Sequence, residues 1–165
     1  MRYQTLQQAI NEIVSAHKAD LTFFTGLESD IDPANNVHYP AIVFTPPAFT
    51  MPFPDGTVGM DTWTLHIESQ EQLSDSSTTA QKQEALDRTR EYLRDIVLEF
   101  VYNYGYENKA VSYGNITENL DFVVTEVAAF SPFIDINDGI TGWQVDLTIQ
   151  EGDYDTLCHL SDIFS

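Results

Sequence analysis

The chain has 165 residues, of which 42% are hydrophobic and 12% aromatic, so it is long enough to bury a core as one domain spanning residues 1–165. Its 26 acidic and 7 basic residues give a formal net charge of −19. This charge argues against direct binding of nucleic acid or of anionic membranes, because both depend on Lys and Arg. The single cysteine, Cys158, excludes an internal disulfide.

The N-terminal residues are too polar for a signal peptide, and no apolar run reaches the ~20 residues that cross a bilayer. We therefore expect folding in a reducing cytoplasm. Five of the seven basic residues lie between Lys82 and Lys109, whereas residues 19–81 and 110–165 contain none. Such acidity either keeps copies soluble or prevents the surface from adhering to a polyanion that passes nearby.

Apolar residues at three- and four-residue spacing predict an amphipathic helix over residues 3–18. These residues are Tyr3, Leu6, Ile10, Ile13 and Val14. Residues 21–24 suit a short strand, and residues 26–39 are rich in turn formers, which indicates a surface loop. A buried strand is expected at residues 41–45.

Five of the seven prolines lie between Pro40 and Pro54. Proline cannot donate a hydrogen bond to a sheet, so this region is expected at an edge or in an extended arm. Phe49, Met51 and Phe53 alternate along it, which predicts a Pro-rich hairpin arm over residues 46–56. An apolar arm of this kind covers the chain's own core or meets a partner chain.

Two segments, residues 57–68 and 142–150, alternate apolar and polar residues, a pattern typical of strands with one buried face. Each contains a tryptophan, Trp63 or Trp143. Between the two segments, apolar spacing predicts a long helix over residues 79–104. Its expected N-terminal capping box is Thr78 with Gln81, and Glu84 precedes Arg88 by four residues on its solvated side.

Four tyrosines cluster around the end of the long helix: Tyr102, Tyr104, Tyr106 and Tyr113. Such a cluster occurs at interfaces or packs beneath a loop. Residues 122–130 are expected to form a strand, residues 131–139 a turn-rich loop, and residues 151–165 an acidic tail. The predicted fold is α+β, a mostly antiparallel sheet with a long hairpin, packed against one long helix and an N-terminal helix.

No residue pattern indicates catalysis, a cofactor or a metal. No glycine-flanked serine elbow is present, and His66 falls on the polar face of its strand, where a solvated histidine is expected. Residues 135–139 resemble part of a calcium loop, but the glycine comes one position early and the closing glutamate is missing, so a plain turn is expected. There is no phosphate-binding glycine loop. We therefore expect a protein that is not an enzyme.

The order of these elements resembles the small ring-forming proteins of tailed bacteriophages at the head–tail junction, namely tail terminators, tail-completion and neck proteins. The phrases at residues 39–44 (YPAIVF) and 142–149 (GWQVDLTI), followed by an acidic tail, are similar to phage structural proteins of this type. The resemblance rests on the order of the elements and on the general character of these segments, not on a diagnostic motif, and it supplies no catalytic residues. The strong acidity and the long loop at residues 26–39 depart from it and leave the position in the particle open.

The resemblance implies a virion structural protein that forms a cyclic homo-oligomer, lines or closes the DNA channel, and contacts neck, portal or tail proteins. It implies neither sequence-specific nucleic-acid binding nor a membrane. Two other hypotheses remain, an acidic binding module or inhibitor that recognises a basic protein, and an enzyme built from scattered acids and His66. The candidate interface residues are the apolar arm and the tyrosine cluster: Phe49, Met51, Phe53, Tyr102, Tyr104, Tyr106 and Tyr113.

Overall fold

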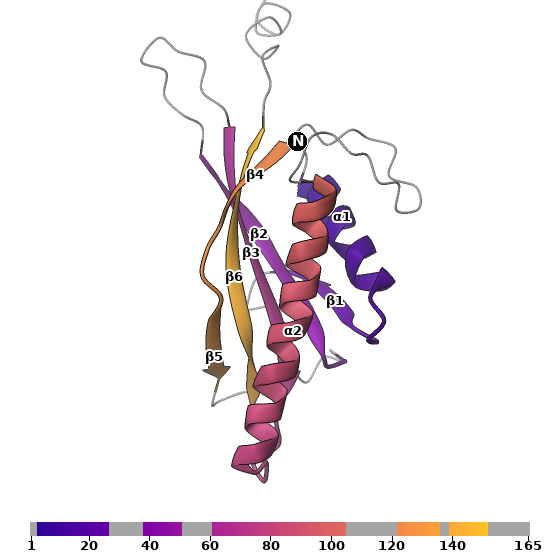
Figure 1. Ribbon diagram of the computed structural model, residues 1–165, viewed down its shortest axis with the longest axis vertical. Coiled ribbons are helices and arrows are strands. Elements are labelled where there is room, and N and C mark those ends of the chain that lie inside the picture. Colours follow the sequence, from indigo (N-terminus) through magenta and orange to yellow (C-terminus); the bar gives the residue numbers. More distant parts are fainter. Residues whose placement is uncertain (1–2, 27–37, 51–60, 105–121, 136–138, 152–165) are drawn as a thin grey trace, which may run out of the picture.

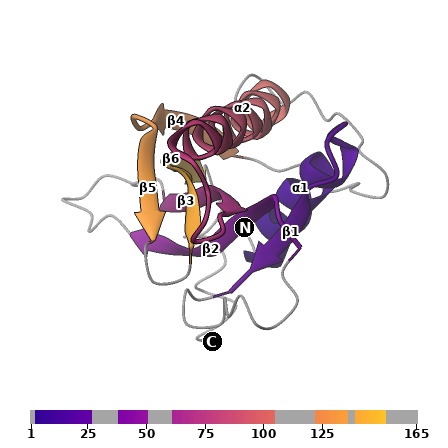
Figure 2. The same ribbon diagram turned by 90° about the horizontal axis from the view of Figure 1, so that it is seen from below.

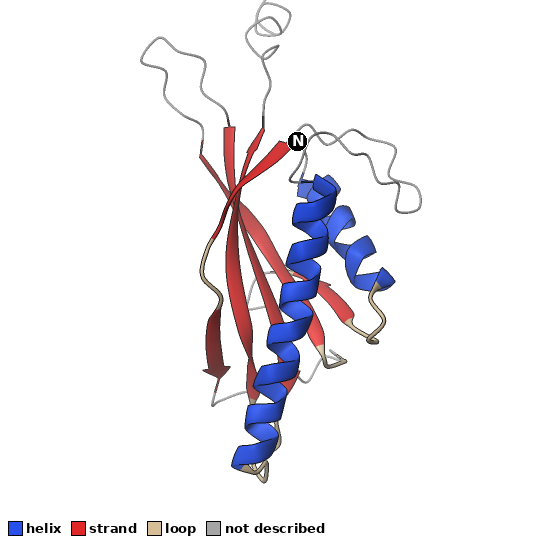
Figure 3. Ribbon diagram, in the orientation of Figure 1, coloured by secondary structure: helices blue, strands red, loops and turns tan. Residues whose placement is uncertain are grey.

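The computed structural model describes residues 3–26, 38–50, 61–104, 122–135 and 139–151. They form an α+β fold with two helices, as predicted, and the predicted mostly antiparallel sheet is a mixed one with a single parallel pair among the described strands (Figures 1 and 3). In chain order the elements are α1 (Tyr3–Ala16), β1 (Thr22–Thr25), β2 (Ala41–Thr50), β3 (Asp61–Gln72), α2 (Thr79–Tyr104), β4 (Phe122–Val127), β5 (Ser131–Asp135) and β6 (Ile140–Glu151).

The two tryptophan strands, β3 and β6, are the central strands of the sheet, as the alternation of their residues predicts. The strand order is β1-β2-β3-β6-β4, and β5 also pairs with β6. β3 and β6 are antiparallel and pair along their whole length, from Asp61 opposite Glu151 to Gln72 opposite Ile140. β1 pairs with β2 in parallel, whereas every other pair is antiparallel. Both helices contribute to the same layer against the sheet (Figure 2).

One face of the central strands builds the core with both helices. Leu65 and Ile67 of β3 and Leu147 of β6 are buried against Ile10 of α1 and Phe100 of α2. The indole N–H of Trp143 donates a hydrogen bond to the carbonyl oxygen of Leu86 at 2.9 Å, which fixes the ring against α2. Trp143 and Trp63 are both partly buried and pack against this core, so the two tryptophans are scaffold residues.

The long helix begins at the predicted capping box. The backbone N–H of Gln81 donates to the Thr78 hydroxyl at 3.2 Å, and the backbone N–H of Thr78 donates to the Gln81 side-chain oxygen at 2.8 Å. These reciprocal bonds satisfy two donors that would otherwise be unpaired at the helix start. The predicted Glu84–Arg88 pair also forms, at 2.8 Å.

The prolines of β2 are accommodated where the strand has only one neighbour. β1 pairs with β2 only as far as Phe44, and the register with β3 then shifts by one residue between Thr45 and Ala48. This bulge contains Pro46 and Pro47, whose missing N–H groups therefore break no ladder on the open side. The antiparallel pair of β2 and β3 confirms the predicted hairpin. The apex of this hairpin, residues 51–60, and the predicted acidic tail, residues 152–165, lie outside the described residues.

The predicted loop at residues 131–139 is wrong in its first half, because Ser131–Asp135 is the strand β5. Pro132 favours a loop in sequence terms, but within the described chain β5 pairs only with β6, and an edge strand tolerates proline. The turn prediction holds at Gly139, which has a φ of 63° immediately before β6. β3 also continues to Gln72, past the predicted end at residue 68.

Candidate functional site

Of the seven predicted interface residues, the structure describes the side chains of two. Phe49 lies near the end of β2, is 47% exposed, and packs against Trp63 with the ring centroids 4.7 Å apart. Tyr102 lies in the last turn of α2 and is 67% exposed. Phe49 and Tyr102 lie on different elements, so each marks its own exposed apolar site. The side chains of the other five lie outside the described residues: Met51, Phe53, Tyr104, Tyr106 and Tyr113.

Leu98 adds a third exposed apolar residue, one that the sequence reasoning missed. It is 52% exposed and lies one helical turn before Tyr102 on the solvent side of α2. Continuing at the same four-residue spacing toward the start of the helix, Arg94 and Arg90 are exposed as well. The signal in the sequence is an apolar residue at a position that the buried stripe of α2 does not use.

A polar cluster occupies the opposite face of the sheet, at the centre of β3 and β6. His66 Nδ1 lies 2.6 Å from the Asp146 carboxylate, and its Nε2 lies 2.8 Å from the Glu68 carboxylate. The side-chain amide of Gln70 donates to the second oxygen of Glu68 at 2.7 Å. His66 and Asp146 are directly opposed in the strand register, and His66, Glu68 and Gln70 follow at two-residue spacing on the same face.

The electrostatics of this cluster keep His66 charged. Its hydrogen bond to Glu68 is the largest cause that raises the pKa of His66 to about 9, with Asp146 contributing and burial opposing. Both ring N–H groups of an imidazolium then donate, one to each carboxylate. Glu68 is only 6% exposed, so this cation and the Gln70 amide compensate a nearly buried charge. His66 thus lies on the polar face as expected and is 30% exposed, but both of its ring nitrogens contact carboxylates.

This geometry limits the chemistry that the cluster can perform. With both ring nitrogens bonded to carboxylates, His66 has no free nitrogen to accept a proton from a nucleophile. The cluster is an ion-paired anchor between β3 and β6. The sequence placed both residues on polar faces of the tryptophan strands, but 80 positions separate them, so only the strand pairing reveals the contact.

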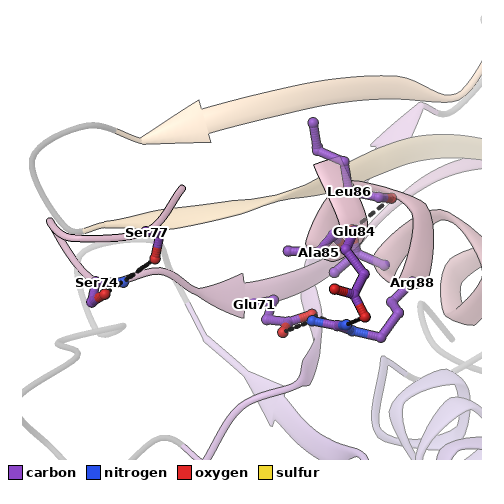
Figure 4. A network of polar contacts seen from close by, with 8 residues as sticks. Glu71, Ser74, Ser77, Glu84, Ala85, Leu86 and Arg88 are labelled. Carbon is purple, nitrogen blue, oxygen red and sulfur yellow. Dashed lines mark hydrogen bonds and ion pairs between the residues drawn. The ribbon is translucent and has the colours of Figure 1, made fainter. Parts of the chain in front are cut away.

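Arg88 of α2 lies in a network of polar contacts with Glu71 of β3 and Glu84 of α2 (Figure 4). Its guanidinium donates to both oxygens of Glu71, at 2.6 and 3.3 Å, and also pairs with Glu84. The bidentate contact ties the end of β3 to the third turn of the following helix. Nearby, the backbone N–H of Ser74 donates to the Ser77 hydroxyl at 3.1 Å, which stabilises the connecting turn.

A groove of about 620 Å³ lies where the end of α1 meets α2. His17 sits in it, with Nε2 3.5 Å from Asp95 and its ring in an edge contact with Tyr92. Its walls combine apolar and charged residues: Ile13, Ala16, His17, Lys18, Asp95, Ile96 and Glu99. The mixture of both charge signs on one apolar floor identifies no particular ligand.

In the described part of the chain, no group of three or more His, Cys, Asp or Glu side chains is arranged to hold a metal ion. None of the helices described there is long and apolar enough to span a membrane. No protein-family model matches the sequence, and no curated protein is significantly similar to it. The functional interpretation therefore depends on the chain's own residues and on the resemblance drawn from its element order.

Proposed function

We propose that the chain is a virion structural protein, a ring-forming subunit at the head–tail junction or tail end of a tailed bacteriophage. The observation that carries the proposal is the element order, an N-terminal helix, a Pro-bearing hairpin, one long helix and closing strands on one sheet. This is the order on which the resemblance to tail terminators, tail-completion and neck proteins rests.

Exposed apolar residues on three separate elements support a subunit that meets other chains. Phe49 lies one residue before the end of β2, Ile134 is 61% exposed on β5, and Leu98 lies on α2. β1 and β4 are the terminal strands of the described sheet, so their outer backbone groups are available for pairing across subunits. A subunit in a closed ring uses two different surfaces, because each copy contacts one neighbour on either side.

The net charge of −19 fits a wall along which DNA passes, because such a wall must repel phosphate rather than bind it. The same charge also favours the second candidate, an acidic module or inhibitor that binds a basic protein. The two candidates differ in their assembly. The first requires a homo-oligomer, and the second requires a complex with a different chain.

Light scattering coupled to size exclusion, followed by electron microscopy of the same fractions, tests the proposal on the full chain. The expected result is one oligomer of fixed copy number that images as a closed ring with a central opening. A monomer at every protein concentration and salt concentration, together with capture of a single basic protein from a lysate, would instead support the inhibitor.

A further inference from the structure

We propose that the solvent face of α2 is the surface through which one copy of the chain docks onto an acidic surface of a second copy. The face consists of Arg90, Arg94, Leu98 and Tyr102, which we call the α2 ridge. The inference rests on the proposed ring, and it identifies one of the two surfaces that such a ring requires.

The ridge is continuous and points away from the core. Its four residues follow one another at four-residue spacing, so they form a row about 18 Å long on the helix surface. The buried side of the same helix contains Leu93 and Phe100. Leu98 remains 52% exposed and Tyr102 remains 67% exposed, although burial of the leucine side chain or of the tyrosine ring is favourable.

The composition of the ridge is that of an interface centre. Arginine and tyrosine are enriched at positions where truncation weakens binding most, since each offers a broad contact area together with a polar group. Four of the chain's seven basic residues lie on α2, namely Lys82, Arg88, Arg90 and Arg94. The ridge contains two of them.

The two ridge arginines lack strong partners in the described part of the chain. Arg90 Nη2 is 3.9 Å from Asp87, at the limit of an ion pair, and no described carboxylate lies within ion-pair distance of Arg94. By contrast, Arg88 is held by two carboxylates at 2.6 and 2.8 Å. In a chain with 26 acids, two weakly paired arginines beside exposed apolar residues are available to a partner.

Charge complementarity selects a second copy as that partner. Residues 19–81 and 110–165 contain acidic residues and no Lys or Arg, so a surface of the next copy built from these segments offers carboxylates to the ridge arginines without competing cations, and this local attraction opposes the overall repulsion between copies. A nucleic acid fits the ridge less well, because Asp87, Glu91 and Asp95 flank it and a uniform row of phosphates would meet them. A folded protein with an acidic surface can instead place its carboxylates opposite Arg90 and Arg94 and away from the flanking acids.

The test compares ridge variants with a matched charge control in the full chain. Arg94→Glu and Leu98→Ser are expected to raise the concentration at half-assembly at least tenfold, measured by light scattering. Lys82→Glu makes the same charge change on an exposed residue of the first turn of α2, outside the ridge, and is expected to assemble like the wild type. Circular dichroism checks that all variants remain folded.

Mixing then tests whether the ridge docks onto a different surface of its neighbour. A folded Arg94→Glu chain keeps its receiving surface, so it is expected to bind wild-type chains and to terminate their assembly at small oligomers. Ridge variants that assemble like the wild type would overturn the inference and leave the ring intact. Folded variants that neither assemble nor bind the wild type would also overturn it, because the ridge would then contact itself. A wild type that never assembles would reject the ring and the docking surface together.

Discussion

The ion-paired cluster on the polar face of the sheet gives the most quantitative prediction. His66→Gln keeps a side chain that can hydrogen-bond to Glu68 or Asp146 but removes the group that titrates. The folded protein raises the pKa of His66 from 6.5 to about 9, so the folded state binds the proton more tightly than the unfolded state. The resulting stabilisation is fully present below pH 6.5 and is lost as the pH rises through 9.

The magnitude follows from the same two pKa values. At about 1.4 kcal/mol per pH unit, the upper limit is roughly 3 kcal/mol in the free energy of unfolding. The His66 side chain is 30% exposed and Asp146 is 54% exposed, so solvent screens the pair. We therefore expect a contribution of about 1–2 kcal/mol.

Urea unfolding at several values between pH 6 and pH 9.5 measures this contribution. Other groups also titrate in this range, so the relevant quantity is the loss of stability in the wild type beyond that in His66→Gln. The control is His17→Gln, since His17 has a single carboxylate contact, at 3.5 Å. The control should lose as much stability as the wild type. Equal losses in the wild type and in His66→Gln would refute the cluster as an energetic anchor.

Three further predictions concern the scaffold, and each is measured by urea or thermal unfolding. Trp143→Ala removes a partly buried ring and the hydrogen bond to Leu86, which should cost about 3 kcal/mol; a variant as stable as the wild type would show that this ring is not scaffold. Gly142→Ala places a Cβ 1.9 Å from the carbonyl oxygen of Ser69, so the strands must separate, at a cost of about 2 kcal/mol or more; an unchanged midpoint would contradict that contact. Thr78→Ala removes the helix cap and should cost about 1 kcal/mol, whereas Ser76→Ala, in the preceding turn, should cost less.

Periodicity in the sequence was sufficient to predict the elements that use one buried face. The alternation around Trp63 and Trp143 predicted the two central strands, and the spacing of apolar residues predicted α2 with its cap at Thr78. These signals are local, because each residue's burial follows from its position in a regular element. The sequence does not predict β5, because Pro132 and the turn formers that follow the strand favour a loop, whereas only the short apolar pair Phe133 and Ile134 favours a strand.

The candidate sites depend on contacts that no local pattern encodes. Asp146 reaches His66 only because β6 pairs with β3 in one register, and a shift by one residue would place the two side chains on opposite faces. The position of Leu98 outside the apolar stripe of α2 is a signal in the sequence, but the packed helix alone shows that the side chain is 52% exposed. The polar cluster at His66 and the exposed face of α2 therefore both depend on pairing and packing between segments that are distant in the sequence.

The most direct test of the ring proposal is the mass and shape of the purified full chain. Native mass spectrometry should give a single species at a fixed whole-number multiple of 18.6 kDa. Electron microscopy should image that species as a closed ring with an opening wide enough for duplex DNA. A lone 18.6 kDa species at all concentrations, or open fibres without closure, would contradict the account.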